Sequence, residues 1–234
     1  LVLPVIVQGQ TVPPHEKYRT LETVHFRVTF PAELEELGKN AAIIAERSYT
    51  ALRESFLRAP SGQIDLLLTD HADFSNGVAN VLPSNRIVVG AQPPLDGFAL
   101  SHFDDWLELV ITHELVHIFH LDRTGPLGTG VRTMLGRVPW SWPTFPGYTT
   151  SSLGIEGVAV HLESVHTEAG RVHGSFYDAI ARTRVLGGES ESVGQGLGRS
   201  PVWPGGSRPY VFGSLFLRHL SDTYGESTLV QFLE

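Results

Sequence analysis

One alternating stretch and two apolar runs predict three short strands in the first half of the chain. Over 23–30 every second position is apolar, which is typical of a half-buried strand. These positions are Val24, Phe26, Val28 and Phe30. Apolar runs at 64–69 and 86–90 predict two more strands, joined by a turn-rich segment containing Asn76-Gly77. Together the strands predict a small mixed sheet.

Two longer segments of the same half have apolar residues at helical spacing. The first, from 32 to about 57, predicts a helix with one face on the core. The second is predicted over about 102–120, with Ser101 as N-cap and Asp104 and Asp105 in its first turn. Further apolar positions predict that most of this helix is buried: Trp106, Leu109, Val110, Leu115, Ile118 and Phe119.

The second half begins with a segment, 122–152, that is rich in Gly, Pro, Thr, Trp and Ser. This composition predicts a long loop, whose aromatic residues fit either a substrate pocket or contact with a neighbouring domain. Helical spacing then resumes over about 155–166, 175–186 and 210–224, and Gly225 is typical of a helix end.

These elements predict an α+β fold in three parts. Residues 1–22 form an N-terminal extension, and 23–121 form an α/β lobe that ends in the second helix. Residues 122–234 form the loop and a mainly helical lobe.

The composition says little about the fold, but it limits the partners and the metal ligands that the protein can have. The formal net charge of −8, with no cluster of Lys or Arg, argues against a nucleic acid or an anionic membrane as partner. Cysteine is absent, so a transition-metal site would need His and carboxylate ligands. No apolar run approaches the roughly 20 residues of a membrane-spanning helix.

The first residues, 1–7, are apolar apart from Pro4 and have the character of the tail of a secretory signal segment. An ordinary N-terminal strand fits them equally well. The chain starts at Leu1 and its single methionine is Met134, which predicts a processed chain or part of a larger protein.

The predicted helix over 102–120 contains His113-Glu114-Leu115-Val116-His117. Histidines four residues apart lie on one helix face, so both imidazoles reach one metal ion. In this pattern the histidines bind zinc and the glutamate is the general base. A catalytic zinc site also needs a third protein ligand. His120 lies about 10 Å along the axis from His113, too far for the same ion, whereas Asp122 after a turn and Glu156 both stay candidates.

The motif followed by Glu156-Gly157-Val158-Ala159 resembles the gluzincin clan of zinc metallopeptidases, whose Glu-Gly-x-Ala helix supplies the third ligand. The resemblance implies a thermolysin-like zincin fold with Glu156 bound to zinc. Glu163, two turns further on, would hydrogen-bond a ligating histidine, or else be a solvated glutamate. Gly154 and Gly157 would let this helix approach the helix of the histidines.

A second motif extends the resemblance. The run 208–213, Arg-Pro-Tyr-Val-Phe-Gly, is similar to the Pro-Tyr-x-x-Gly helix of aminopeptidase-like gluzincins. It implies that Tyr210 stabilises the oxyanion, the alternative being a tyrosine packed at a helix start. Residues 76–94 resemble the clan's sheet, whose edge strand holds an extended peptide. The segment that anchors a free amino terminus in aminopeptidases is absent, so exopeptidase action is not supported, and Leu153-Gly154-Ile155 replaces the frequent Trp-Leu-Asn.

The whole chain also resembles the N-terminal peptidase-like domain of bacterial proteins that continue into a TolB-like β-propeller. The segments concerned are 64–70, 74–77, 85–88 and 113–122. Such proteins are usually extracytoplasmic, which implies a periplasmic or secreted location and a C-terminal propeller in the parent chain.

The expected function is zinc-dependent endopeptidase hydrolysis, with Glu114 as general base and a peptide or protein as substrate. Three alternatives remain open from the sequence. They are an inactive zincin-fold domain that serves as a structural or peptide-binding module, a metal-free scaffold with buried histidines, and hydrolysis of a substrate other than a peptide.

Overall fold

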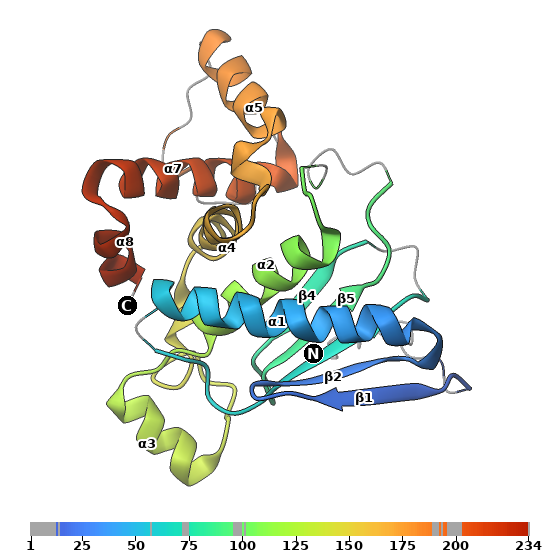
Figure 1. Ribbon diagram of the computed structural model, residues 1–234. Coiled ribbons are helices and arrows are strands. Elements are labelled where there is room, and N and C mark those ends of the chain that lie inside the picture. The colour runs from blue at the N-terminus through green and yellow to red at the C-terminus, as the bar shows by residue number, and fades with distance from the viewer. Residues whose placement is uncertain are drawn as a thin grey trace, which may run out of the picture.

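A five-stranded mixed sheet lies on one side of the protein, as the computed structural model shows (Figure 1). The structure describes residues 13, 15–56, 58–71, 75–95, 100, 102–188, 192, 194–195 and 203–233. The predicted signal-like segment 1–7 and the predicted cap Ser101 lie outside the described residues. Helices cover the sheet and form the rest of the described chain, which confirms the α+β class.

The sheet has the strand order β1-β2-β3-β5-β4. Its strands are β1 Tyr18–Glu22, β2 Phe26–Pro31, β3 Ile64–Thr69, β4 Gly77–Asn80 and β5 Arg86–Gly90. The central pairs β2–β3 and β3–β5 are parallel, and the edge strands β1 and β4 run antiparallel to their neighbours.

The sequence predicted the buried strands better than the edges. β3 and β5 are confirmed at their predicted bounds, whereas β2 begins at Phe26 and Val24 is 83% exposed outside it. β1 lies within the segment interpreted as an extension, and β4 within the predicted turns. Both have short or mostly exposed patterns, since an edge strand needs fewer apolar residues than a central one.

Two helices pack on the sheet. Helix α1 covers Glu35–Ser55 after a 3₁₀ turn at Ala32–Leu34, close to its predicted range. Helix α2 covers Trp106–Leu121, so it begins four residues later than predicted. The side chain of Asp105 caps it by accepting hydrogen bonds from the backbone N–H groups of Leu107 and Glu108. The two aspartates therefore precede the helix rather than form its first turn.

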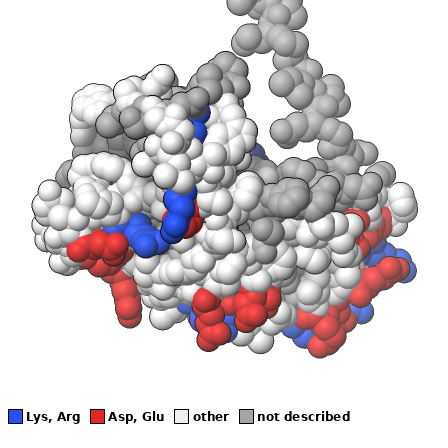
Figure 2. Space-filling model, turned by 90° about the horizontal axis from the view of Figure 1, so that it is seen from above, with Lys and Arg blue, Asp and Glu red and all other residues white. Residues whose placement is uncertain are grey.

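Charged side chains on the outside of these helices are mostly paired. Arg47 Nη2 of α1 donates to Glu108 Oε1 of α2 at 2.6 Å, and Lys39 Nζ donates to Glu36 Oε1 at 2.8 Å. On the face seen in Figure 2, acidic and basic side chains gather beside one another along one edge. Exposed pairs of this kind contribute little to stability, typically about 0–1 kcal/mol each.

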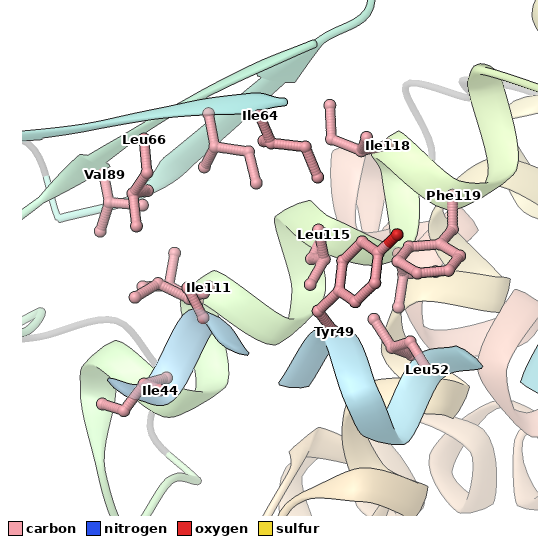
Figure 3. Close-up of a cluster of buried hydrophobic side chains, with 14 of the residues drawn as sticks. Ile44, Tyr49, Leu52, Ile64, Leu66, Val89, Ile111, Leu115, Ile118 and Phe119 are labelled. Carbon is pink, nitrogen blue, oxygen red and sulfur yellow. The ribbon is translucent and has the colours of Figure 1, made fainter. Parts of the chain in front are cut away.

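The main core lies between the sheet and the two helices. Ile64, Leu66 and Val89 point from the sheet toward both helices (Figure 3). The helix side chains that meet them are Ile44, Tyr49, Leu52, Ile111, Leu115, Ile118 and Phe119. Almost every residue of α2 is buried, so this helix is fixed on most sides and can hold functional groups in place.

The second half of the chain is helical, and part of the predicted loop is not a loop. Its helices are α3 Pro126–Leu135, α4 Ser152–His166, α5 Ser175–Leu186, α7 Arg208–Tyr224 and α8 Glu226–Leu233. Helix α3 and a 3₁₀ turn at Pro146–Thr149 lie within 122–152. Two glycines and two threonines weaken the helical pattern of α3, but Pro126 suits a first helical position and Gly136 ends the helix at φ 74°. Among the described residues no helix is both long and apolar enough to span a membrane.

Helices α4 and α7 cross at a pair of glycines. A Cβ atom on Gly157 would lie 2.6 Å from Gly213 C, and one on Gly213 would lie 2.6 Å from Leu153 O. The prediction that Gly157 faces the histidine helix is therefore wrong, because it faces α7. Gly154 faces Thr150 of its own chain segment, where a Cβ would lie 2.6 Å from Thr150 Cγ2.

We expect Gly157→Ala to lower the free energy of unfolding by about 2–3 kcal/mol, because the added methyl group meets backbone atoms that cannot turn away. Urea denaturation measures the loss. Gly130→Ala in α3 is the matched control: nothing lies within 4 Å of its added Cβ, so it should stabilise the protein by roughly 0.5–1 kcal/mol. Equal stability of Gly157→Ala and the wild type would contradict the close crossing.

Candidate metal centre

Three side chains from two helices meet at one point. His113 and His117 lie on α2, and Glu156 lies in the first turns of α4. His113 Nε2 is 3.2 Å from His117 Nε2, and Glu156 Oε2 is 3.6 Å and 3.4 Å from these two atoms. Helix α2 provides the spacing of four residues, and α4 crosses it with the carboxylate directed at the gap between the imidazoles.

These distances fit a metal ion. Bonds of about 2.0–2.1 Å at tetrahedral angles place neighbouring ligand atoms about 3.3 Å apart. Glu156 Oε2 and His117 Nδ1 are buried and have no hydrogen-bond partner among the described residues. An unpaired buried carboxylate oxygen is costly, and a bound cation removes that cost. Two nitrogens and one oxygen are also the donor set of many catalytic zinc sites.

A buried ion pair contacts His113 at Nδ1, the ring nitrogen that does not face Glu156. Glu163 is fully buried and its Oε2 lies 2.7 Å from His113 Nδ1. Arg171 donates from Nε to Glu163 Oε1 at 2.7 Å and from Nη2 to Glu163 Oε2 at 2.6 Å. Arg171 Nη2 also lies 2.6 Å from His113 Nδ1, so this nitrogen is held by both members of the ion pair. With Nδ1 held in this way, the lone pair of Nε2 is left for the ion. Glu163 is thus placed as predicted and is not a solvated surface residue.

The charges of this group depend on one another. Burial opposes ionisation of Glu163, but the Arg171 guanidinium and the hydrogen bonds of Arg171 and His113 lower the pKa of Glu163 to about 2. Burial and Arg171 act to lower the pKa of His113, yet the nearby carboxylates of Glu156 and Glu163 raise it to about 9. The carboxylates that favour a proton on this imidazole also favour a cation bound to it.

Glu114 lies in the same cavity and against the edge strand β4. A Cβ atom on Gly77 would lie 2.4 Å from Glu114 Cγ and 2.7 Å from its Oε1, so a larger residue at this position of β4 would displace the Glu114 side chain. Gly77 and Glu114 both line a cavity of about 340 Å³ that also contains the three converging side chains. The edge strand therefore passes beside the motif.

Two tyrosines complete the cavity. The ring of Tyr210 stacks toward His113, with ring centroids 6.4 Å apart, and Tyr177 lines the wall and is almost fully buried. Burial and the carboxylates of Glu156 and Glu114 raise the pKa of Tyr210 above its ordinary value. Burial raises the pKa of Tyr177 to about 12. Both phenols therefore stay protonated near neutral pH and are able to donate a hydrogen bond to a ligand in the cavity.

Other candidates from the sequence lie elsewhere. Asp122 directly follows the last residue of α2, where it accepts hydrogen bonds from Arg132, Arg137 and Asn85 and does not line the cavity. His120 is buried, and burial lowers its pKa to about 3. No residue of 122–152 is among the described residues that line the cavity, so this segment does not form its wall.

Sequence reasoning missed Arg171 and Tyr177. Arg171 follows Gly170, where φ is 87° and a Cβ would lie 2.5 Å from Ser164 Cα. The sequence offers one signal for Arg171. It directly follows a glycine that a turn requires, and it comes eight residues after the candidate Glu163. Tyr177 lies in α5 with no local pattern that distinguishes it from a core residue.

Comparison of this chain with the models of known protein families finds no match, and a search of curated proteins also finds none. Its function is therefore inferred from the geometry of the site.

Proposed function

We propose that the protein is a zinc-dependent metallopeptidase with a thermolysin-like fold, which hydrolyses internal peptide bonds. One observation carries the proposal. The donor atoms of His113, His117 and Glu156 stand 3.2–3.6 Å apart, and Glu114 of the same helix faces the same cavity. A structural zinc site would instead use a fourth protein ligand and would not need this glutamate.

Each residue around the site has a role in hydrolysis. His113, His117 and Glu156 would hold a zinc ion, which when bound would act as a Lewis acid and lower the pKa of a water molecule to about 7. Glu114 accepts a proton from the attacking water and passes it to the leaving amine. Tyr210 donates a hydrogen bond to the carbonyl oxygen as negative charge develops there. Glu163 and Arg171 keep His113 Nε2 directed at the site.

The edge strand β4 supports an extended peptide as substrate. β4 pairs with β5 and stands at the end of the strand order, and among the described residues no strand pairs with its other edge, which can accept a further strand. Gly77, Val78 and Ala79 of β4 line the cavity, and Val78 is 53% exposed. A peptide paired with β4 would run along the cavity past Glu114.

Metal binding and peptide hydrolysis test this function together. We expect the purified protein to bind about one zinc ion per chain and to cleave members of a peptide library, and a chelator to remove both properties until zinc is restored. His117→Ala should lower zinc affinity and activity together. Stoichiometric zinc without cleavage of any library peptide would support an inactive zincin-fold domain instead.

A further inference from the structure

Tyr177 of helix α5 is a buried residue of the metal cavity to which the proposed hydrolysis assigns no role. It lines the cavity and is 2% exposed. Its ring belongs to an apolar cluster whose other buried members are Val160, Val172, Ile180 and Val211. This cluster holds the ring, so the hydroxyl group is the part of the residue that is left to act on a ligand.

The hydroxyl group of Tyr177 is buried and has no hydrogen-bond partner among the described residues. Burial raises the pKa of this phenol to about 12, and the charges of Arg171, Glu163 and Glu156 also act on it, so the hydroxyl group lies toward the metal site. A guanidinium group only donates hydrogen bonds, so Arg171 cannot accept the phenol proton. Glu163 already accepts hydrogen bonds from Arg171 at both of its oxygens. The phenol therefore has a proton to donate and lacks an acceptor among the described residues.

The packing of the free protein does not account for this hydroxyl group. A buried hydroxyl group without a partner costs free energy. Phenylalanine would fill the same space among the same apolar neighbours without that cost. An acceptor that a ligand brings into the cavity would explain why the position carries a phenol.

A peptide on the edge strand β4 brings such acceptors. Gly77 and Val78 line the cavity from β4, whereas Tyr177 and Tyr210 line it from α5 and α7. Figure 1 shows these two helices on one side of α2 and the sheet on the other. An extended peptide that pairs with β4 through one edge directs the carbonyl groups of its other edge away from the sheet. Those carbonyl groups face the wall that contains Tyr177.

A neutral carbonyl group suits this position better than a carboxylate. The guanidinium group of Arg171 is already paired with Glu163, and the carboxylates of Glu114 and Glu156 line the cavity. Two carboxylates balance the two charges of a zinc ion, so the cavity has no excess positive charge that would attract an acidic group. A carbonyl oxygen needs a hydrogen-bond donor but no countercharge.

We propose that the hydroxyl group of Tyr177 donates a hydrogen bond to a main-chain carbonyl oxygen of the bound peptide and so positions the substrate. The inference rests on the proposed peptidase function. Tyr210 stacks toward His113 and is placed for the reacting carbonyl, so Tyr177 contacts a neighbouring peptide group. Helix α5 buries two residues, Tyr177 and Ile180, so a small shift of this helix brings the shielded hydroxyl group to the peptide.

The stability of Tyr177→Phe without substrate is the first test. We expect its midpoint of thermal unfolding to be at least as high as that of the wild type, because the unpaired hydroxyl group is removed. Tyr224→Phe is the matched control, since this tyrosine at the end of α7 is 65% exposed and its substitution should change nothing. A lower midpoint for Tyr177→Phe would show that the hydroxyl group has a partner in the free protein, which would overturn the proposal.

Peptide affinity is the second test. Zinc-loaded Glu114→Gln protein allows binding to be measured without cleavage, and adding Tyr177→Phe should weaken its tightest-binding library peptide by about tenfold. In the otherwise wild-type protein, Tyr177→Phe should raise KM by a similar factor with little change in kcat, and zinc content should stay the same. Tyr224→Phe should change neither value. Equal affinity with and without the Tyr177 hydroxyl group would overturn the proposal.

Thioamide peptides locate the contact. Replacing the carbonyl oxygens of the peptide one at a time by sulfur, a weaker acceptor, should weaken binding at one position when Tyr177 is present. The same replacement should matter less in Tyr177→Phe, because the two changes remove the same hydrogen bond. Equal effects of every replacement in both proteins would show that Tyr177 does not contact a main-chain carbonyl.

These measurements separate this inference from the peptidase function. Cleavage by the wild type with an unchanged KM in Tyr177→Phe would overturn the inference and leave the peptidase function. Peptide binding that Tyr177→Phe weakens, without cleavage by the wild type, would support the contact in an inactive peptide-binding domain. No binding of any library peptide to the zinc-loaded protein would overturn both.

Discussion

Glu114→Gln is expected to lower kcat/KM for peptide hydrolysis by roughly 10³-fold while the protein keeps its zinc. The amide has the shape of the carboxylate, so it fits the same space against Gly77, but it cannot accept the proton of the attacking water. Glu114 contributes none of the three converging donor atoms, so zinc affinity should change little. Peptide cleavage rates and zinc content of the same preparation measure both effects.

Glu108→Gln on the same helix is the control, since this glutamate pairs with Arg47 outside the cavity and should leave kcat/KM unchanged. A Glu114→Gln variant that keeps zinc and cleaves peptides at the wild-type rate would remove Glu114 from the mechanism. Loss of zinc along with activity would instead assign it a role in metal binding.

The core of the candidate site was predictable because its signals are local. A spacing of four residues brings His113 and His117 together on any helix, whatever the rest of the fold does. Predicting Glu156 as the third ligand required a second motif, because the distance of Glu156 from the histidines depends on how α4 crosses α2. The buried strands β3 and β5 were predictable for the same local reason. A short, continuous apolar run that is bounded by turns is typical of a buried strand.

The surroundings of the site depend on contacts distant in sequence, which a single sequence does not reveal. Arg171 reaches Glu163 through a turn at Gly170, and Gly77 accommodates Glu114 from a strand 37 positions earlier in the chain. Helix α3 was missed because its apolar stripe is short and faces outward, so the usual link between amphipathic pattern and core does not apply.

Arg171→Met should destabilise the folded protein by about 3–5 kcal/mol near pH 7. Methionine fills much of the same space, but Glu163, which is fully buried, loses both hydrogen bonds from the guanidinium and keeps only those with His113 and with the backbone N–H of residue 171. A buried carboxylate without its countercharge is among the costliest defects in a core. Since Glu163 orients His113, zinc affinity should also fall by about 10–100-fold. Urea denaturation of the metal-free protein and competition with a zinc chelator measure the two effects.

The pH dependence separates lost charge pairing from lost packing. In the wild type, the pKa of Glu163 lies near 2, below its ordinary 4.5, so its stabilising contribution is complete above about pH 5 and disappears as pH falls toward 2. In Arg171→Met, burial without the guanidinium raises this pKa above 4.5, so the folded state retains a proton that the unfolded state releases, and stability falls as pH rises. The difference in free energy of unfolding between the wild type and Arg171→Met should therefore increase from near pH 3 to near pH 7. Adding Glu163→Gln should recover much of the loss near pH 7, because the buried carboxylate that lost its countercharge is removed. A difference in stability between wild type and Arg171→Met that stays constant with pH would show that Arg171 acts through packing alone.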